Sequence, residues 1–487
     1  MNSRRTRIIL TIVLTLLLGL AAGGYMGTKW AAGKDENEVS VQSADTDGSS
    51  GDSGKSSGKN MKKIDQAYNL IKKHYVRNVS DQNLTEGAIQ GMLKMLDDPY
   101  SEYLDAEKLK QFNEQIESSF EGIGAEVSME DNKVTIVAPI KGSPAEKAGL
   151  RPKDKILKID GKSIEGLDLN EAVSKIRGEK GTKVKLEIER PGTKKPFTKE
   201  ITRDKIPVET VYGDMKQTNG KKTGVIKLTS FSEHTADDFL KELDKLEKDG
   251  MQGLVIDVRG NPGGLLQSVE AILDVFITKD KPYLQIENRK GDKEPRYSKL
   301  DKKKDYPINI LTDEGSASAS EILAVAFKEN GYDTVGVKSF GKGTVQQAVA
   351  LGDGSEIKLT LFKWLSPDGN WIHKKGVKPT IEQKQPAYYY ANPIDASKPL
   401  VYDQTGDSIE NVQIMLTGLG YEPKRTDGYF SKETEQAVKA FQQAHKLKAD
   451  GKVDSKTAET IEAEVVAKIR SGKDDKQLKK ALDSLYK

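Results

Sequence analysis

The chain contains no cysteine and only four histidines among its 487 residues. Without cysteine it cannot form disulfides, thiol nucleophiles, iron–sulfur clusters or cysteine-based zinc sites. The histidines lie too far apart in the sequence for a local metal-binding motif such as HExxH; they are His74, His234, His373 and His445. The sequence therefore predicts neither a metal ion nor another cofactor.

An excess of one charge is also lacking, because 77 Lys and Arg residues stand against 74 Asp and Glu residues and leave a net charge of +3. Nucleic-acid-binding proteins usually carry a basic excess, so nucleic acid is not a predicted partner. With 36% hydrophobic and 31% charged residues, the composition is that of a soluble globular protein rather than a multi-span membrane protein.

One long hydrophobic run is present, at the N-terminus. Residues 8–28 carry no charge and follow three arginines. About 20 apolar residues can cross a bilayer, and preceding arginines favour an exported remainder. A cleaved signal peptide with its apolar core at residues 8–22 is the alternative. We prefer a retained anchor and assign residues 1–33 to a cytoplasmic tip and a transmembrane helix.

Residues 34–60 are rich in Ser, Gly, Asp and Lys and predict a flexible linker. In residues 61–120, apolar side chains recur every three or four positions, for example Ile64, Tyr68 and Ile71, and indicate helices. This N-terminal helical region is either a dimerisation element or a shoulder of the next domain.

Residues 121–204 alternate short β-branched runs, such as VTIVAPI and VKLEIER, with the helix-like segment LNEAVSKIRG. They predict a small mixed β/α module that opens on GIGAEV. Backbone N–H groups of Gly122, Ile123 and Gly124 can form a nest for an anion such as a C-terminal carboxylate. An ordinary turn is the alternative.

Residues 205–385 alternate continuous apolar strands (GVIKLTSF, GLVIDV, INILTD) with helices predicted at 235–248, 265–276 and 318–329. This pattern indicates an α/β core with a parallel sheet. Residues 386–400 have no regular period and predict a linker. Residues 401–487 predict a helical module and a C-terminal tail.

The α/β core contains a candidate nucleophile, Ser318, at the start of a predicted helix in GSASASEI. Ser318 and Glu321 fit a capping box, which is a purely structural role. The same position also places a hydroxyl beside helix N–H groups that stabilise negative charge. Ser316 and Ser320 are competing candidates.

A candidate base follows in SFGKGTVQQ, where Lys342, Thr344 and Gln346 differ by two positions and share one face of a strand. A lysine can activate a serine if burial lowers its pKa from about 10.4 to about 7–8, and Ser–Lys pairs are a known variant of the triad. Gln346 can hold the amine by a hydrogen bond.

A third feature, VIDVRGNPGGLL, places Gly263 and Gly264 in a turn from strand to helix. Either glycine N–H, with that of Ala319, can form an oxyanion hole. A tight structural turn is the alternative.

Two other catalytic arrangements receive little support. GVKSFGKG nearly fits the P-loop pattern, but its last residue is glycine and a strand, not a helix, is predicted to follow. A Ser-His-Asp triad would need His234 or His373, and the spacing of neither supports it.

The motifs SASASEI, SFGKGTVQ and DVRGNPGG, with LDDPYSEYL upstream, resemble the carboxy-terminal processing proteases. These are serine proteases with a Ser–Lys dyad that is often extended by a glutamine. The resemblance implies Ser318 as the nucleophile, Lys342 as the general base and Gln346 as its orienting partner. It implies amide donors at Ala319 and at Gly263 or Gly264.

The β/α module resembles the PDZ domain of this family through GIGAEV, GSPAEKAGLRPKDKILKIDGKSI and LNEAVSKIRGEKGTKVKLEIER. The resemblance implies that Gly122, Ile123 and Gly124 bind the C-terminal carboxylate of substrates. Arg177, at the end of the PDZ helix, is our candidate for coupling ligand binding to the dyad. Lys153 replaces a usual glycine and requires a left-handed backbone or a changed turn.

The C-terminal segment resembles a three-helix peptidoglycan-binding domain through LGY, TDGYF, AVKAFQ and DGKVD. Together these features predict a multidomain α/β protein. Its predicted activity is that of a membrane-anchored serine endopeptidase with an extracytoplasmic catalytic part. Protein C-termini, peptidoglycan and a second copy of the chain are its predicted partners. The alternative is a latent adaptor, against which the complete set of Ser318, Lys342 and Gln346 argues.

Overall fold

The computed structural model describes residues 53–130 and 132–486. The predicted anchor at residues 1–33 lies outside this part. Among the described residues, no helix combines the length and the apolar character needed to cross a membrane. The described residues divide into two compact units, one of residues 111–344 and 362–486 and one of residues 53–110 and 345–361.

The smaller unit contains helices α2 (Ser53–His74) and α3 (Asp81–Lys94), strand β1 (Glu102–Leu104) and most of β17 (Thr344–Ala350) and β18 (Glu356–Leu365). The helix α2 starts inside residues 34–60, so the prediction of a flexible linker up to residue 60 is wrong for its last residues. The helix continues into this segment because adding residues to an existing helical turn costs little free energy. Ile64 and Ile71, which the periodicity placed on one helical face, are exposed on α2.

The PDZ-like module is a sheet of order β3–β4–β5–β7–β8, with β6 paired to β5. Its elements are β3 (Ala125–Glu130), β4 (Lys133–Pro139), α5 (Pro144–Lys147), β5 (Lys155–Ile159), β6 (Lys162–Ser163), α6 (Leu169–Ile176), β7 (Lys183–Glu189) and β8 (Phe197–Thr202). Asp168 and Glu171 form a capping box at the start of α6. Lys153 has a φ of +70°, so the left-handed alternative is the one adopted.

The protease-like core contains a six-stranded sheet of order β10–β11–β12–β15–β16–β19. Its strands are β10 (Val211–Thr218), β11 (Lys221–Leu228), β12 (Gly253–Asp257), β15 (Ile308–Thr312), β16 (Asp333–Gly336) and β19 (Ile381–Glu382). All but β10 run parallel, and every residue of β12 and β15 is buried. The prediction of a buried parallel sheet is confirmed, because continuous apolar strands are those covered on both faces.

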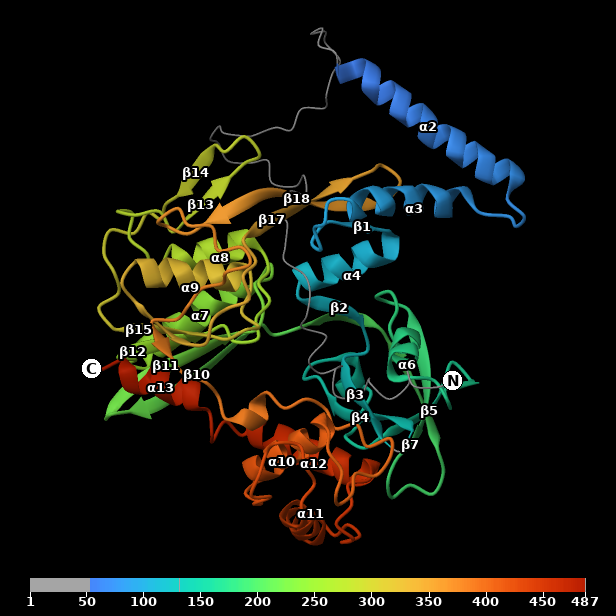
Figure 1. The fold of residues 1–487 in the computed structure, drawn as a ribbon, viewed down its shortest axis with the longest axis vertical. Helices are drawn as coiled ribbons and strands as arrows, with labels where there is room; N and C mark the ends of the chain where they lie inside the picture. Colours follow the sequence, from blue (N-terminus) through green and yellow to red (C-terminus); the bar gives the residue numbers. More distant parts are fainter. Residues whose placement is uncertain (1–52, 131, 487) are drawn as a thin grey trace. The chain divides into compact units, whose positions relative to one another are not determined.

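Three helices pack beside one another on this core (Figure 1): α7 (Thr235–Lys248), α8 (Leu266–Leu273) and α9 (Ala319–Glu329). The ring of Phe276 contacts Phe239 of α7 and Phe327 of α9 at centroid distances of 6.0 and 5.4 Å. The remaining elements of this region are α4 (Ala106–Ile116), β2 (Ser119–Gly122), β9 (Asp204–Pro207), β13 (Leu284–Glu287) and β14 (Lys293–Arg296). The short strands β1 and β2 were not foreseen in the predicted helical region.

The C-terminal module consists of the 3₁₀ turn η1 (Ala387–Tyr389), α10 (Asp407–Leu419), α11 (Lys432–Ala444) and α12 (Ser455–Arg470). The three helices enclose Phe430 and Phe441, which are fully buried. Tyr388 and Ile394, from the predicted linker at residues 386–400, belong to the same core.

The tail beyond this module returns to the protease-like core. In α13 (Lys476–Ser484) and just after it, Ala481 and Leu485 pack with apolar residues from one face of the sheet, namely Val225, Val255, Leu311 and Val335. Asn309 Nδ2 of β15 donates to the Ala481 carbonyl at 2.8 Å and to Ser484 Oγ at 2.9 Å. Helix α13 therefore covers part of the central sheet.

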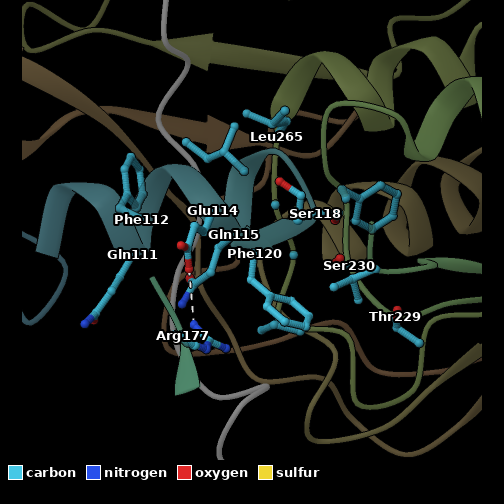
Figure 2. Close-up of a pocket in the computed structure, with 17 residues that line it drawn as sticks. Gln111, Phe112, Glu114, Gln115, Ser118, Phe120, Arg177, Thr229, Ser230 and Leu265 are labelled. Carbon is cyan, nitrogen blue, oxygen red and sulfur yellow. Dashed lines mark hydrogen bonds and ion pairs between the residues drawn. The ribbon is translucent and has the colours of Figure 1, made fainter. Parts of the chain in front are cut away.

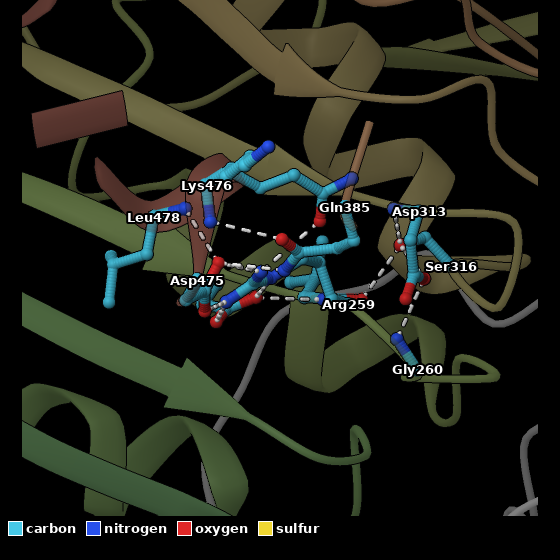
Figure 3. A network of polar contacts seen from close by, with 11 residues as sticks. Arg259, Gly260, Asp313, Ser316, Gln385, Asp475, Lys476 and Leu478 are labelled. Atoms are coloured by element: carbon cyan, nitrogen blue, oxygen red, sulfur yellow. Dashed lines mark hydrogen bonds and ion pairs between the residues drawn. The ribbon is translucent and has the colours of Figure 1, made fainter. Parts of the chain in front are cut away.

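A partly buried ion pair fixes the start of this tail (Figure 3). Arg259, just after β12, donates to Asp257 at 2.7 Å and to both oxygens of Asp475 at 2.8 Å. Gln385 Nε2 donates to Asp475 at 2.7 Å. Burial raises the pKa of the Asp475 carboxyl, but the hydrogen bonds and the charge of Arg259 outweigh burial and hold this pKa below its ordinary value.

We expect Asp475→Asn to destabilise the core by about 1.5–3 kcal/mol, the range for hydrogen bonds to charged groups. Because the folded-state pKa is lowered, the contribution is present above about pH 3.9 and is lost as the pH falls further. Thermal unfolding at pH 7 and limited proteolysis of the tail measure it. Asp483→Asn, exposed on the same helix, is the matched control. Equal stability of the two variants at pH 7 would contradict this role of Asp475.

Candidate active site

Ser318 precedes the first residue of α9 in a backbone conformation that non-glycine residues avoid, with φ 54° and ψ −113°. Such a conformation costs about 1–3 kcal/mol and is held only where surrounding structure enforces it. The residue as a whole is 7% exposed. The predicted start of the helix is confirmed, whereas this strain was not foreseen.

The two competing serines have structural roles. The Ser316 hydroxyl donates to the Val258 carbonyl and the Ser320 hydroxyl donates to the Asn261 carbonyl, both at 2.8 Å. Both serines are fully buried. These two bonds tie the start of α9 to the segment after β12, so Ser318 is the candidate nucleophile of the three.

Lys342 lies between β16 and β17 and is 5% exposed. Its carbonyl accepts from Trp364 Nε1 at 2.9 Å, and the next carbonyl, of Gly343, accepts from Trp371 Nε1 at 2.7 Å. The Gly343 N–H donates to His373 Nδ1 at 3.3 Å. The predicted base therefore lies in a buried turn that two indole groups hold in place.

The alternative arrangements fit the geometry poorly. A strand, β17, follows Lys342 where a P-loop requires a helix. His234 is exposed at the start of α7 and forms no capping bond.

The carboxylate of Glu321 joins the turns that carry Ser318 and Lys342. Glu321 is fully buried and accepts from the N–H groups of Ser318 at 2.9 Å, Lys342 at 2.7 Å and Gly341 at 2.7 Å, and from Ser339 Oγ at 2.5 Å. Burial raises the pKa of Glu321, and these hydrogen bonds oppose the rise. The capping-box motif could identify the contact with Ser318 but not the other three.

The glycine turn lies directly against the nucleophile. A Cβ atom at Gly263 would stand 2.8 Å from Ser318 Cβ and 3.0 Å from the Ala319 nitrogen, and one at Gly264 would stand 1.9 Å from the Phe231 carbonyl oxygen. Both positions therefore require glycine. The Gly263 N–H donates to Asn261 Oδ1 at 2.8 Å.

Gln346 is described within the smaller unit, where it is fully buried on β17. Its Nε2 donates to Thr360 Oγ1 at 2.9 Å, and the Thr360 N–H donates to Ser101 Oγ at 3.0 Å. Ser101 in turn donates to Asp98 at 2.7 Å. The upstream motif LDDPYSEYL thus supports the strand pair that holds Gln346.

The loop of Gly122, Ile123 and Gly124 is pinned by its carbonyl groups. Ala145 N–H donates to the Ile123 carbonyl and Ser143 Oγ donates to the Gly124 carbonyl, both at 2.8 Å. Gly124 has a φ of 74°, and a Cβ there would stand 2.5 Å from Ser143 Cβ. The loop leads directly into β3, which is an edge strand of the sheet.

Arg177 caps the C-terminal end of α6 and lines a pocket of about 320 Å³ (Figure 2). Its Nη1 donates to Glu114 Oε2 at 3.2 Å, and its guanidinium lies 4.8 Å from the centre of the Phe120 ring. Gly263 and Gly264 line the same pocket. Sequence reasoning did not identify Glu114 or Phe120 as partners of Arg177.

Comparisons with known families match most of the chain. Residues 222–383 match peptidase family S41, and residues 135–190 match the PDZ domain. Residues 16–108 match the N-terminal domain of the activating protease CtpB, and residues 405–461 match a putative peptidoglycan binding domain.

Whole-length relatives agree with these matches. The carboxy-terminal processing protease CtpB of Bacillus subtilis is 56% identical over 429 residues, which are 88% of this chain and 89% of the relative. CtpA of the same organism is 44% identical over 87% of this chain and 90% of its own length. A probable CtpA-like serine protease of Staphylococcus aureus is 40% identical over 82% of this chain and 80% of its own. The chain therefore belongs to the carboxy-terminal processing proteases of peptidase family S41, and it is a serine-type protease with PDZ and peptidoglycan-binding domains.

Proposed function

We propose that this protease is an exported, membrane-anchored endopeptidase that captures substrates by their C-termini and cleaves them with a Ser318–Lys342–Gln346 site. The observation that carries the proposal is the strained Ser318 at the start of α9, joined through Glu321 to the turn of Lys342. Strained backbone concentrates at functional sites, and neither neighbouring serine has a comparable conformation.

In the proposed acylation step, Ser318 Oγ attacks the scissile carbonyl carbon while neutral Lys342 takes the hydroxyl proton. The resulting ammonium then protonates the leaving amine. In deacylation, Lys342 removes a proton from water, the hydroxide attacks the ester and Ser318 recovers its proton. Gln346 orients the amine of Lys342 by a hydrogen bond.

The oxyanion would be stabilised by the Ala319 N–H at the start of α9 and by a glycine N–H. Since the Gly263 N–H is already engaged with Asn261, the arrangement favours Gly264 over Gly263 as the second donor. The positive end of the α9 dipole acts in the same direction.

Substrate capture would follow the strand-addition mode of peptide recognition. An extended C-terminal peptide adds to the edge strand β3, and its carboxylate meets the N–H groups of the loop at residues 122–124. Arg177 would couple this binding to the active site, because its side chain lines the same pocket as Gly263 and Gly264.

The location and the assembly follow from segments around the catalytic part. The uncharged run at residues 8–28 would anchor the chain, so that the C-terminal module meets peptidoglycan outside the cytoplasm. Exposed apolar residues on α2 and α3, among them Ile64, Leu70 and Met92, would pair with a second copy. A latent adaptor carries out no catalysis and would not need the strained backbone conformation of Ser318, which argues against this alternative.

Ser318→Ala is expected to lower cleavage of an unfolded protein with an apolar C-terminus by at least about 10³-fold, since it removes the nucleophile. The full-length protein in detergent is compared with the variant over time. Mass spectrometry of acid-quenched wild-type enzyme should locate the acyl group on Ser318. Acylation of Ser316 or Ser320, or equal activity of the variant, would refute the assignment.

The pH dependence tests the lysine base. Activity should rise between about pH 6 and 9 as Lys342 loses its proton, because a general base must be neutral to act. Lys342→Arg, which keeps the charge at these pH values, should be as inactive as Lys342→Ala. A flat wild-type profile of kcat/KM across this range would exclude Lys342 as the base.

Arg177→Ala tests the coupling between the PDZ domain and the active site. Peptides with a free C-terminal carboxylate should stimulate cleavage of a short reporter, whereas the same peptides amidated should not. The ratio of stimulated to unstimulated rate should fall about 5-fold or more in Arg177→Ala, within the usual range of allosteric coupling. Lys175→Ala, exposed on the same helix, is the control. An unchanged ratio in Arg177→Ala would remove Arg177 from the mechanism.

A further inference from the structure

We propose that Glu321 is a positioning residue that sets the geometry between the nucleophile Ser318 and the base Lys342. The inference rests on the proposed function, and it assigns the buried carboxylate a role beyond the capping of α9. Glu321 does not take part in the proton transfers described above.

The contacts divide evenly between the two carboxylate oxygens. Oε2 accepts from the Ser318 N–H at 2.9 Å and from the Lys342 N–H at 2.7 Å, so a single atom connects the two catalytic positions. Oε1 accepts from Ser339 Oγ at 2.5 Å and from the Gly341 N–H at 2.7 Å. The carboxylate thus holds the segment of residues 339–342 at three points.

These contacts exceed what a capping box needs. In a capping box, the glutamate at the third helical position reaches back to one N–H group, that of the N-cap residue. The other three donors to Glu321 follow it in the sequence by 18, 20 and 21 residues. They stabilise no helix end and serve to dock a separate segment on the start of α9.

The donor set matches an ionised carboxylate. Three of the groups are backbone amides, and the fourth, the Ser339 hydroxyl, accepts from the Val377 N–H at 2.7 Å and directs its proton to Glu321. An ionised carboxylate only accepts hydrogen bonds, so all four donors are satisfied. An amide in its place would turn an NH₂ group toward two donors.

One consequence for catalysis follows. A displacement of about 1 Å between reacting groups can cost about 10²-fold in rate, so loosening this junction should lower kcat.

The test is Glu321→Gln in the full-length protein, measured beside the wild type with the unfolded substrate. We expect kcat to fall about 10²-fold with KM changed by less than about threefold. A purely structural glutamate would lower thermal stability but leave kcat of the folded enzyme unchanged. Wild-type kcat in the folded variant would overturn the proposal.

Matched variants complete the design. Glu329→Gln changes a half-buried glutamate at the far end of the same helix, which accepts from the Asp368 N–H, and should keep wild-type activity. If Glu321→Gln does not fold, Ser339→Ala removes one of the four donors and keeps the charge. It should lower kcat about tenfold, and wild-type kcat in Ser339→Ala would overturn the proposal. Full activity of Ser318→Ala would instead refute the proposed function itself.

Discussion

A charge buried in the protein interior is stable only where hydrogen-bond donors replace the water that it has lost. Glu321 meets this condition with groups from two separate segments, the start of α9 and the turn before β17. Neither segment can shift alone without leaving the carboxylate short of donors. The indole groups of Trp364 and Trp371 hold the same turn through the carbonyls of Lys342 and Gly343.

Close backbone approach is the second constraint on the site. The glycine turn after β12 stands so near to Ser318 and Phe231 that no side chain fits at either glycine. The hydroxyls of Ser316 and Ser320, two residues before and after Ser318, donate to carbonyls of the segment that follows β12. These anchors on both sides of Ser318 provide the support that its strained conformation requires.

The sequence predicted those features that arise from local pattern. The bounds of α7 and the buried strands β12 and β15 follow from the alternation of helical segments with continuous apolar runs, and the start of α9 follows from its capping box. Each of these predictions is confirmed. Features that depend on residues far apart in the chain were not foreseen. The three distant donors to Glu321 and the strain at Ser318 depend on tertiary packing, which no short sequence window contains.

Two smaller differences between the sequence predictions and the structure have a similar cause. The left-handed conformation at Lys153 was one of two open alternatives, because the sequence could not show which turn joins α5 to β5. Tyr388 was assigned to a linker because its segment lacks a period, yet the ring packs into the C-terminal core. A single large side chain can dock a segment that has no regular structure of its own.

The docking of α13 has a consequence for biosynthesis. A ribosome makes the chain from the N-terminus, so Ala481 and Leu485 emerge after every strand of the central sheet and after the three helices of the C-terminal module. Until then, the sheet face of Val225, Val255 and Leu311 lacks its cover, and Arg259 lacks Asp475. Domains generally fold in order as they are synthesised, but this core is completed only after the helices α10, α11 and α12 that follow it have emerged. A chain truncated before α13 therefore carries all of the proposed catalytic residues on an unfinished scaffold.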